Sequence, residues 1–251
     1  YQKNETDLVI IVTPRLVRGL LATLDRDDDA VPAAIHWCLA PAMARQSRLG
    51  PDGHAARGEF LPPVPLPRRM WAGGALEFFD PLRVGDQVTR HSRIADVQAK
   101  EGRTGALCFV TIEHDYATAR GPAIKERQDI VYCAAETALG AAPPTEPARP
   151  EARWRRSLTA DATMLFRYSA LTFNGHRIHY DRAYCREVEH YPGLVVHGPF
   201  QATLLIEHAA AARGRAQRRV DFRAERPLFD GAAFTLNAVA EGDALSLWEI
   251  G

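Results

Sequence analysis

The residues best suited to chemistry lie in one stretch of the second half, residues 168–212. Within it Asn174 and His179 stand five positions apart, in the sequence FNGHRIHYD. An amide can hold a water molecule and an imidazole can take its proton, so this pair could hold and activate water. Gly198 follows where a helix is expected to begin, and the free N–H groups of a helix start attract a carbonyl oxygen. Together the three residues indicate chemistry at a carbonyl compound.

Each of these residues also has a structural interpretation. A histidine at this spacing alone is more often structural, and Asn174 equally suits an Asx turn. We expect Tyr180 and Asp181 to brace the turn, with Asp181 either holding His179 or capping a following helix. His176, His179 and Asp181 superficially resemble metal ligands, but no zinc spacing is completed elsewhere, so no metal site is predicted.

Composition limits the remaining functions. A chain of 251 residues suits two domains of about 100–150 residues each. Its 31 basic and 31 acidic residues give a net charge of zero, so we expect no general affinity for nucleic acid or acidic membranes. Four scattered cysteines, no membrane-spanning run and no signal peptide favour the cytoplasm, although the sequence opens on Tyr1 rather than Met, which weakens the argument from a missing leader.

The pattern of apolar residues predicts an α+β protein. Residues 14–24 form an amphipathic helix with Thr13 as its N-cap, and Leu16, Leu20 and Leu24 make its buried stripe. Residues 35–39 should be buried, and residues 40–67 form a long structured loop. A second amphipathic helix is predicted at 194–212. Strands are predicted at residues 75–79, 87–99, 104–116, 123–133, 220–224, 232–240 and 244–250.

The chain divides into two similar halves. Residues 135–150 are rich in alanine and proline and predict a linker between domains at 1–134 and 151–251. PLRVG at 81–85 and PLFDG at 227–231 share the pattern P-L-x-x-G, and each lies between two predicted strands. We therefore expect a duplicated unit, a helix wrapped by an antiparallel sheet, with the two copies side by side as one extended sheet.

Four segments carry a resemblance to a known family. FNGHRIH at 173–179 and VHGP at 196–199 resemble the G-D-x-N-P-I-H and A-H-G-M motifs of MaoC-like (R)-specific enoyl-thioester hydratases and dehydratases. FLPPVPLPRRMWAGG at 60–74 and LEFFDPLRVGD at 76–86 resemble the first domain of the double-hot-dog subgroup. That subgroup includes type 2 3-hydroxyacyl-thioester dehydratases and the mesaconyl-C4-CoA and itaconyl-CoA hydratases. The resemblance covers essentially the whole chain and implies a double hot-dog fold.

The resemblance also implies a division of roles. The aspartate of the family motif is Asn174 here and its Asn-Pro is His176-Arg177, so His179 must carry the proton largely alone, because an amide does not titrate. Asn174 would position water and the Gly198 N–H would stabilise the thioester oxygen. One active site per chain is expected, since the first half lacks this turn. The residues expected to bind substrate are Arg68, Arg69, Trp71, Gly73, Arg177 and His197.

These points predict a hydro-lyase that adds water to an enoyl thioester, with acyl-CoA as substrate, no metal and no other cofactor. A dicarboxylic ester of the mesaconyl or itaconyl type is included and would need a cation near its distal carboxylate. Two alternatives remain open at this stage: a hot-dog thioesterase and a non-catalytic acyl-binding subunit of a larger complex. We expect substrate to enter between the domains along residues 68–74, and the protein to be a homodimer.

Overall fold

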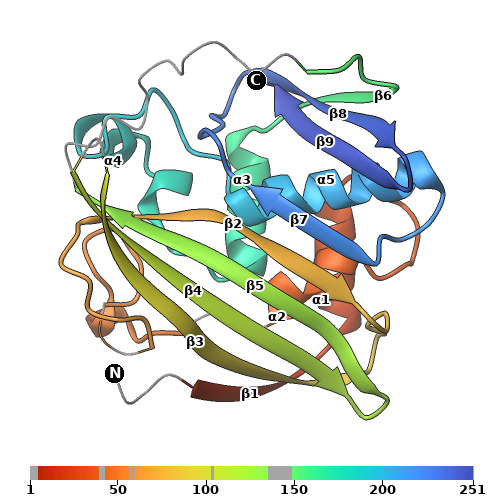
Figure 1. Cartoon of the computed structure of the whole chain (residues 1–251), viewed down its shortest axis with the longest axis horizontal. Helices are drawn as coiled ribbons and strands as arrows, with labels where there is room; N and C mark the ends of the chain where they lie inside the picture. Colours follow the sequence, from red (N-terminus) through yellow and green to blue (C-terminus); the bar gives the residue numbers. More distant parts are fainter. Residues whose placement is uncertain are drawn as a thin grey trace.

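The larger layer of the protein is a six-stranded antiparallel sheet (Figure 1), in a computed structural model that describes residues 5–39, 43–56, 58, 60–102, 105–134 and 149–250. Its strand order is β1-β3-β4-β5-β2-β7, so a strand of the second half completes the sheet of the first. The strands are β1 (Glu5–Ile11), β2 (Arg68–Phe78), β3 (Gln87–Gly102), β4 (Gly105–Thr118), β5 (Gly121–Cys133) and β7 (Arg219–Arg223).

A second, three-stranded sheet belongs wholly to the second half. It has the order β6-β8-β9, with β6 at Trp154–Thr159, β8 at Ala233–Glu241 and β9 at Ala244–Ile250. Because the described strands form two sheets, the expectation of one extended sheet is wrong. The repeated element order is nevertheless present. The elements β1, α1, α2, β2 and β3 of the first half correspond to β6, α3, α5, β7 and β8 of the second.

Strand β2 begins earlier than the predicted start at residue 75. Its pairing with β5 shifts register between Trp71 and Gly73, which marks a β-bulge. A side chain at Gly74 would lie 2.1 Å from the Arg127 carbonyl oxygen, so glycine is needed where the backbones approach. The bulge interrupts the alternation of apolar and polar residues, and this irregular pattern hid the first half of the strand.

The described residues form five helices. They are α1 (Pro14–Thr23), α2 (His36–Leu39), α3 (Ala162–Leu171), α4 (Arg182–Glu187) and α5 (Gly198–Arg213), with short 3-10 turns at Ala33–Ile35, Gln46–Arg48 and Arg177–His179. The side chain of Thr13 caps α1 by accepting a hydrogen bond from the Leu16 N–H at 3.2 Å, which confirms the predicted start.

The longest helix, α5, departs from its predicted form. It starts at Gly198 rather than residue 194, because Val195 forms a β-bridge with Phe229 and is extended. It is also buried on several sides and is not amphipathic, since it contacts β8 and β9 of the three-stranded sheet and the Ala33–Ile35 turn of the first half. Its buried residues are Phe200, Ala202, Thr203, Leu204, Ile206, His208 and Ala209.

Both halves share one hydrophobic core. A single cluster of buried side chains includes Leu20 and Leu76 from the first half and Leu165, Phe200 and Leu236 from the second. Apolar burial of this kind is the main favourable term in folding. The two halves are therefore not independent in the interior of the molecule, whatever connects them; residues 135–148 of the predicted linker lie outside the described residues.

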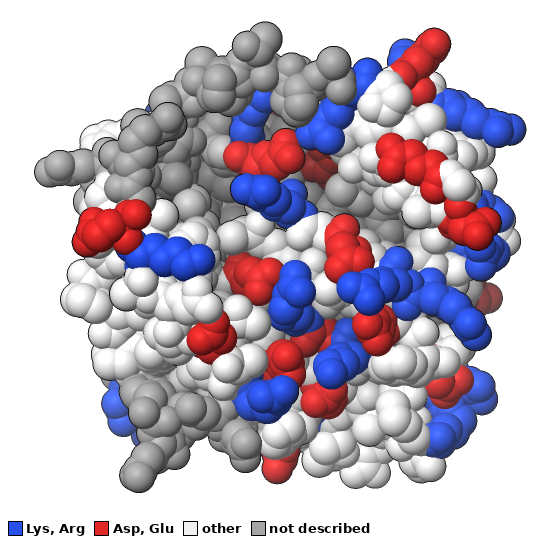
Figure 2. Space-filling view, viewed as in Figure 1, with Lys and Arg blue, Asp and Glu red and all other residues white. Residues whose placement is uncertain are grey.

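Charged residues of both signs are interspersed on the face of the six-stranded sheet (Figure 2). Cross-strand pairs account for part of this pattern, including Arg93 with Glu113 and Arg219 with Glu77. This face therefore carries no field of one sign, in keeping with the zero net charge. No helix in the described part of the chain has both the length and the apolar composition to cross a membrane.

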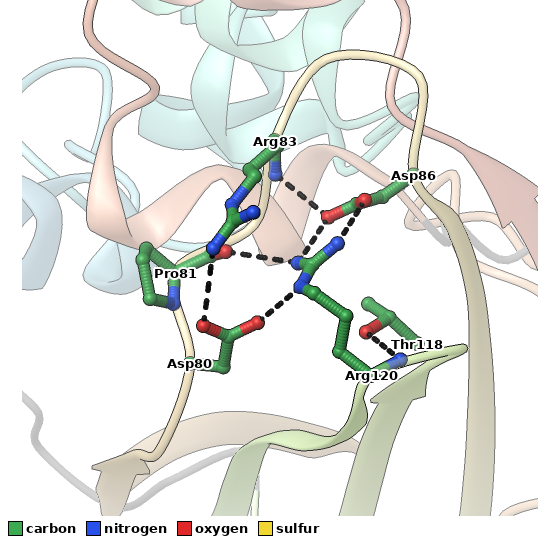
Figure 3. Close-up of polar contacts among 6 residues, drawn as sticks. All are labelled: Asp80, Pro81, Arg83, Asp86, Thr118 and Arg120. Atoms are coloured by element: carbon green, nitrogen blue, oxygen red, sulfur yellow. Dashed lines mark hydrogen bonds and ion pairs between the residues drawn. The ribbon is translucent and has the colours of Figure 1, made fainter.

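The two P-L-x-x-G turns occupy matching places, between β2 and β3 and between β7 and β8. Figure 3 shows how Arg120, at the β4–β5 hairpin, fastens the first: it donates to Asp80 at 2.6 Å and to Asp86 at 2.6 Å. In the second turn, Asp230 accepts a hydrogen bond from the Leu194 N–H at 2.8 Å and forms an ion pair with Arg182. The second turn is thus tied to the segment that leads into α5.

Candidate active site

Asn174 shapes the turn that carries the histidines. Its N–H donates to the Ser169 carbonyl at 2.8 Å, so the turn continues directly from α3. Its side-chain oxygen accepts from the His176 N–H at 2.9 Å, which is the hydrogen bond of an Asx turn. The structural interpretation of Asn174 is therefore confirmed, and the amide N–H₂ group and the second lone pair of the oxygen are left for a water molecule.

His179 is held as a neutral base. Its Nδ1 lies 2.7 Å from the Val195 carbonyl oxygen, and since a carbonyl only accepts, Nδ1 carries the proton and Nε2 has a free lone pair. Burial lowers the pKa of His179 to about 4, against the raising effect of the Val195 carbonyl. The imidazole is therefore neutral at pH 7, as a general base requires.

Asp181 does not hold His179. It caps α4 by accepting from the Tyr184 N–H at 3.0 Å, and its other oxygen receives two hydrogen bonds from Arg177, at 3.1 and 2.7 Å. Tyr180 donates to the Gly175 carbonyl at 3.1 Å. Of the two roles considered for Asp181, the helix cap is the correct one, and both residues brace the turn as expected.

The ring of His197 packs against the ring of His179. The two rings are stacked with centroids 3.6 Å apart, and Nε2 of His197 lies 2.8 Å from the Ser169 hydroxyl. Only 1% of His197 is exposed, and burial lowers its pKa well below the usual value. The structure thus places this predicted substrate-binding side chain behind the base.

Gly198 opens α5 with no side chain capping the helix N-terminus. A Cβ atom there would lie 2.7 Å from the Trp71 ring, so glycine lets the two halves approach closely at this point. The Trp71 indole N–H is buried and has no acceptor in the described part of the chain. Gly198 and Trp71, predicted for different roles, are brought together here.

Trp71 belongs to an aromatic group formed by both halves. Its ring lies 4.6 Å from Phe222 of β7 and 5.7 Å from Trp37 of α2, the latter edge to face. Trp37 in turn donates from its indole N–H to Glu126 at 2.7 Å. Gly73 lies in the same bulge, and a Cβ there would meet the Phe222 carbonyl oxygen at 2.5 Å, so its role in the structure is close packing against β7.

A loop of the first half docks on the turn that carries Asn174 and His179. The Arg177 N–H donates to the Asp52 carbonyl at 2.9 Å, and the Arg177 guanidinium donates to the Pro51 carbonyl at 3.1 Å. Gly53 and Gly175 pack backbone to backbone, since a Cβ at Gly53 would lie 2.0 Å from the Gly175 carbonyl oxygen. These contacts deliver two more polar side chains, Asp52 and His54, to the site.

Asp52 and His54 form a hydrogen-bonded pair. Nδ1 of His54 lies 3.1 Å from one carboxylate oxygen, and the His54 N–H donates to the other at 3.1 Å. The His54 ring is 4.0 Å from that of His176, which is 5.4 Å from His179. With the stack on His197, four imidazoles follow one another in contact. We call His54, His176, His179 and His197 the histidine row.

Three groups at one end of this row have the types found in metal sites. Ligand atoms of Asp52, His54 and His176 lie within 4.8 Å of one another, whereas the trio considered from the sequence, His176, His179 and Asp181, is not brought together in this way. The hydrogen bond between His54 and Asp52 accounts for the arrangement of the observed group without an ion. We therefore treat it as a polar cluster.

The predicted substrate-binding arginines differ in what they contact. Arg177 is engaged with Asp181 and stacks on the Tyr184 ring at 4.1 Å, so it holds the turn. Arg68 pairs with Glu189, 3.5 Å away. Arg69 lies near the histidine row: burial is the main cause of the lowered pKa of His54 and His176, and the charge of Arg69 lowers both further. No carboxylate pairs with Arg69 among the described residues.

Sequence reasoning missed Asp52, His54, Ser169 and the Val195 carbonyl. The first two lie in the segment assigned only as a structured loop, and a lone histidine after a P-D-G turn has no diagnostic spacing. Ser169 looked like an ordinary helix residue, and a backbone carbonyl leaves no mark in a sequence.

Comparison with known proteins identifies the family of the chain. Residues 34–230 match the family model described as hydroxyacyl-thioester dehydratase type 2. The chain is 44% identical over 220 residues to mesaconyl-C(4)-CoA hydratase of Chloroflexus aurantiacus, covering 88% of this chain and 79% of that protein. It is 26% identical over 235 residues to the mitochondrial hydroxyacyl-thioester dehydratase type 2 of Schizosaccharomyces pombe, covering 82% of this chain and 77% of that protein.

Solved structures show the same fold. A MaoC-like dehydratase from Phytophthora capsici superposes with a TM-score of 0.70 at 13% identity, covering 99% of this chain and 90% of the other. A Mycobacterium tuberculosis protein with a double hot-dog fold gives 0.55 at 12% identity, covering 98% and 88%. The protein is thus a double hot-dog protein of the MaoC-like class. It belongs to the hydroxyacyl-thioester dehydratase type 2 family and is a hydratase/dehydratase that acts on the double bond of an enoyl thioester.

Proposed function

We propose that the chain hydrates a short dicarboxylic enoyl-CoA of the mesaconyl-C4 type. The observation that carries this proposal is Arg69, a cation beside the histidine row with no carboxylate partner in the described part of the chain. A dicarboxylic acyl group needs such a cation for its distal carboxylate, and arginine binds carboxylates through two parallel hydrogen bonds. The 44% identity to a mesaconyl-C(4)-CoA hydratase supports the same substrate class.

In the mechanism we propose, water lies between the Asn174 amide and Nε2 of His179. His179 takes a proton as the water oxygen bonds to the β-carbon, and the electrons of the double bond move toward the α-carbon and the thioester oxygen. The Gly198 N–H at the positive end of α5 stabilises that oxygen. The proton on His179 then passes to the α-carbon, and dehydration is the reverse.

The aromatic group at Trp71 packs against Gly198. Its indole N–H has no acceptor among the described residues, and a substrate oxygen would supply one. The roles of Trp71 and Arg69 both place the acyl group between the two halves, beside β2, with the site assembled within one chain. Coenzyme A enters as part of the substrate, and no other cofactor is required by these steps.

A substrate panel tests the proposal. Purified protein is supplied with mesaconyl-C4-CoA, crotonyl-CoA and a C8 enoyl-CoA, and loss of enoyl absorbance is followed together with release of free thiol. We expect hydration without thiol release and the highest kcat/KM for the dicarboxylic ester. In Arg69→Met the preference for the dicarboxylic ester over crotonyl-CoA should fall at least about 10-fold, since a charge-assisted hydrogen bond is lost. Equal use of both esters by the unaltered protein contradicts the substrate class, and thiol release indicates a thioesterase.

A further inference from the structure

The proposed reaction creates a positive charge on His179, in a position where burial disfavours the protonated form. Once His179 has taken a proton it is an imidazolium, in a position where burial lowers its pKa to about 4. Position 174, where the family motif has an aspartate, carries only an amide. A carboxylate elsewhere in the site would stabilise the transient cation.

Two carboxylates are hydrogen-bonded to residues of the turn or of the histidine row, Asp181 to Arg177 and Asp52 to His54. Asp181 is occupied, because it receives both hydrogen bonds of Arg177 and caps α4. Asp52 instead directs its charge at an imidazole, through Nδ1 of His54 at 3.1 Å. Burial raises the pKa of Asp52, but its hydrogen bonds with His54 and the charges of His54 and His176 outweigh this, and the pKa lies below its usual range. Asp52 is therefore ionised at neutral pH.

We propose that Asp52 is the counter-charge of the active site, and that it stabilises the protonated state of the catalytic imidazole through His54 and His176. This inference rests on the proposed function, since it concerns the cation formed when His179 takes a proton from water. It makes Asp52 a positioning residue supplied by the first half, in the role that a carboxylate at position 174 would play from closer range.

Asp52 stays deprotonated through every proton transfer of the proposed reaction. The water oxygen bonds to the β-carbon, one water proton moves to Nε2 of His179, and that same proton is later transferred to the α-carbon. Asp52 keeps its negative charge, and His54 keeps its Nδ1 proton directed at the carboxylate. The contribution is electrostatic, and it acts over ring contacts of 4.0 and 5.4 Å in a half-buried environment.

The opposing charges come from two other elements. Arg69 of β2 lowers the pKa of His54 and His176 after the larger effect of burial, whereas Arg177 is neutralised by Asp181. A distal carboxylate bound at Arg69 would cancel that opposing field. With a dicarboxylic substrate bound, Asp52 would raise the pKa of the histidines in the row, and the charge of Arg69 would no longer lower it.

The docked loop explains how a residue so distant in sequence holds a fixed place. Asp52 is positioned by its own carbonyl, which accepts from Arg177, and by the Gly53–Gly175 contact. Asparagine at position 52 would keep the hydrogen bond to the His54 N–H, so Asp52→Asn removes charge at nearly constant shape.

The first test is kinetic. Asp52→Asn should lower kcat on the order of 10–10²-fold with little change in KM, because the lost interaction belongs to the charged stage of the reaction. The acid limb of the pH profile should move to lower pH, since without the anion each imidazole binds its proton more weakly. Adding Asn174→Asp to this variant should restore at least half of the lost rate on a logarithmic scale. Asp80→Asn, which removes a half-buried carboxylate paired with Arg120 in the turn between β2 and β3, is the matched control and should leave kcat unchanged.

The second test needs no substrate. Titration of the histidines by NMR should show the protonation midpoint of His54 falling by at least half a pH unit in Asp52→Asn, and no change in Asp80→Asn. An unmoved midpoint overturns the proposal, as does an Asp52→Asn enzyme with the wild-type kcat. If the unaltered protein hydrated no enoyl-CoA, the proposed function would fail, while the NMR titration would still decide whether Asp52 is the counter-charge.

Discussion

The two halves of the chain repeat one order of elements but contribute different parts of the site. The first half has five strands in its sheet, and the described part of its core helix is only α2, four residues long. The second half has a sixteen-residue helix, α5, preceded by the turn with Asn174 and His179. Where the second half builds a helix N-terminus, the first half sends out the loop that carries Asp52 and His54. The difference supports the proposal that one active site is built from both halves, with the acid–base turn from the second and the groups around it from the first.

Each half has a histidine at the start of its core helix, His36 at α2 and His197 before α5, and the two have different surroundings. In the second half His197 stacks on the base, whereas in the first half His36 is fully buried with Nε2 3.8 Å from Glu126. Glu126 also accepts from Trp37, Gln128 and Tyr116, and this network holds the aromatic group against Gly198. The polar interior of the first half thus has a supporting role.

The largest expected effect comes from replacing His179. His179→Ala should lower kcat on the order of 10²–10⁴-fold through loss of the general base, with less effect on KM. Its partner in the comparison is His36→Ala, which should cost about 1–3 kcal/mol of unfolding free energy through a cavity and a disturbed Glu126 network, yet leave kcat of the folded protein within a few-fold. Steady-state kinetics and denaturant unfolding of both variants measure this. A catalytic loss in His36→Ala as large as in His179→Ala would break the proposed division of labour.

A smaller effect is expected where the two halves touch over the site. Gly53→Ala should lower kcat and the unfolding free energy together, since the new Cβ would meet the Gly175 carbonyl oxygen at 2.0 Å and displace the loop. Gly85→Ala is a matched control with a similar positive φ, +93° against +86°, and no atom within 4 Å of the new Cβ. We expect about 10-fold or more loss of kcat in Gly53→Ala and none in Gly85→Ala. Equal kinetics in the two variants would show that docking of the loop does not matter for catalysis.

The smallest effect is expected in the two P-L-x-x-G turns. Asp230→Ala should lower the midpoint of thermal unfolding by a few degrees, because a partly buried carboxylate that receives the Leu194 N–H and Arg182 is lost. Arg120→Ala, at the exposed first turn, should lower it less, since surface ion pairs contribute little. Only Asp230→Ala should also affect KM, because Leu194 leads into α5. Calorimetry measures the unfolding midpoints of both variants and steady-state kinetics their KM values. A larger fall of the midpoint in Arg120→Ala than in Asp230→Ala would contradict the prediction.

Much of the fold was predictable because the local signals agreed with the final structure. Thr13 and Pro14 mark the start of α1, and β3, β4, β5, β7, β8 and β9 lie within a few residues of their predicted positions. Strands β1 and β6 were not predicted, and β2 begins well before its predicted start. The start of α5 was misplaced because a long-range bridge between Val195 and Phe229 keeps the apolar residues before Gly198 extended. The division into two sheets depends on which strand edges meet, and no local pattern encodes that.

The candidate site was predictable where its residues are close in sequence. Asn174, His179 and Gly198 fall in two short motifs, and the ring of His179 stacks on that of His197, the residue before Gly198. His54 and Asp52 reach His176 only because two glycines allow two backbones to touch, an event that depends on the whole fold. The roles assigned to these residues stay predictions until the variants are measured.

The pairing of β2 with β7 has a consequence for how the protein unfolds. Residues Gly73–Glu77 are hydrogen-bonded on one side to β5 and on the other to β7, so this segment belongs to both halves at once. Its amides cannot exchange with solvent unless β5 or β7 separates from β2. Separation of either strand exposes the core that the two halves share. Hydrogen exchange in β2 should therefore follow global opening, and the protein should melt in one cooperative transition. During synthesis the same edge of β2 has no partner until β7 is made, which leaves a strand edge open to mispairing for the time it takes to translate the second half.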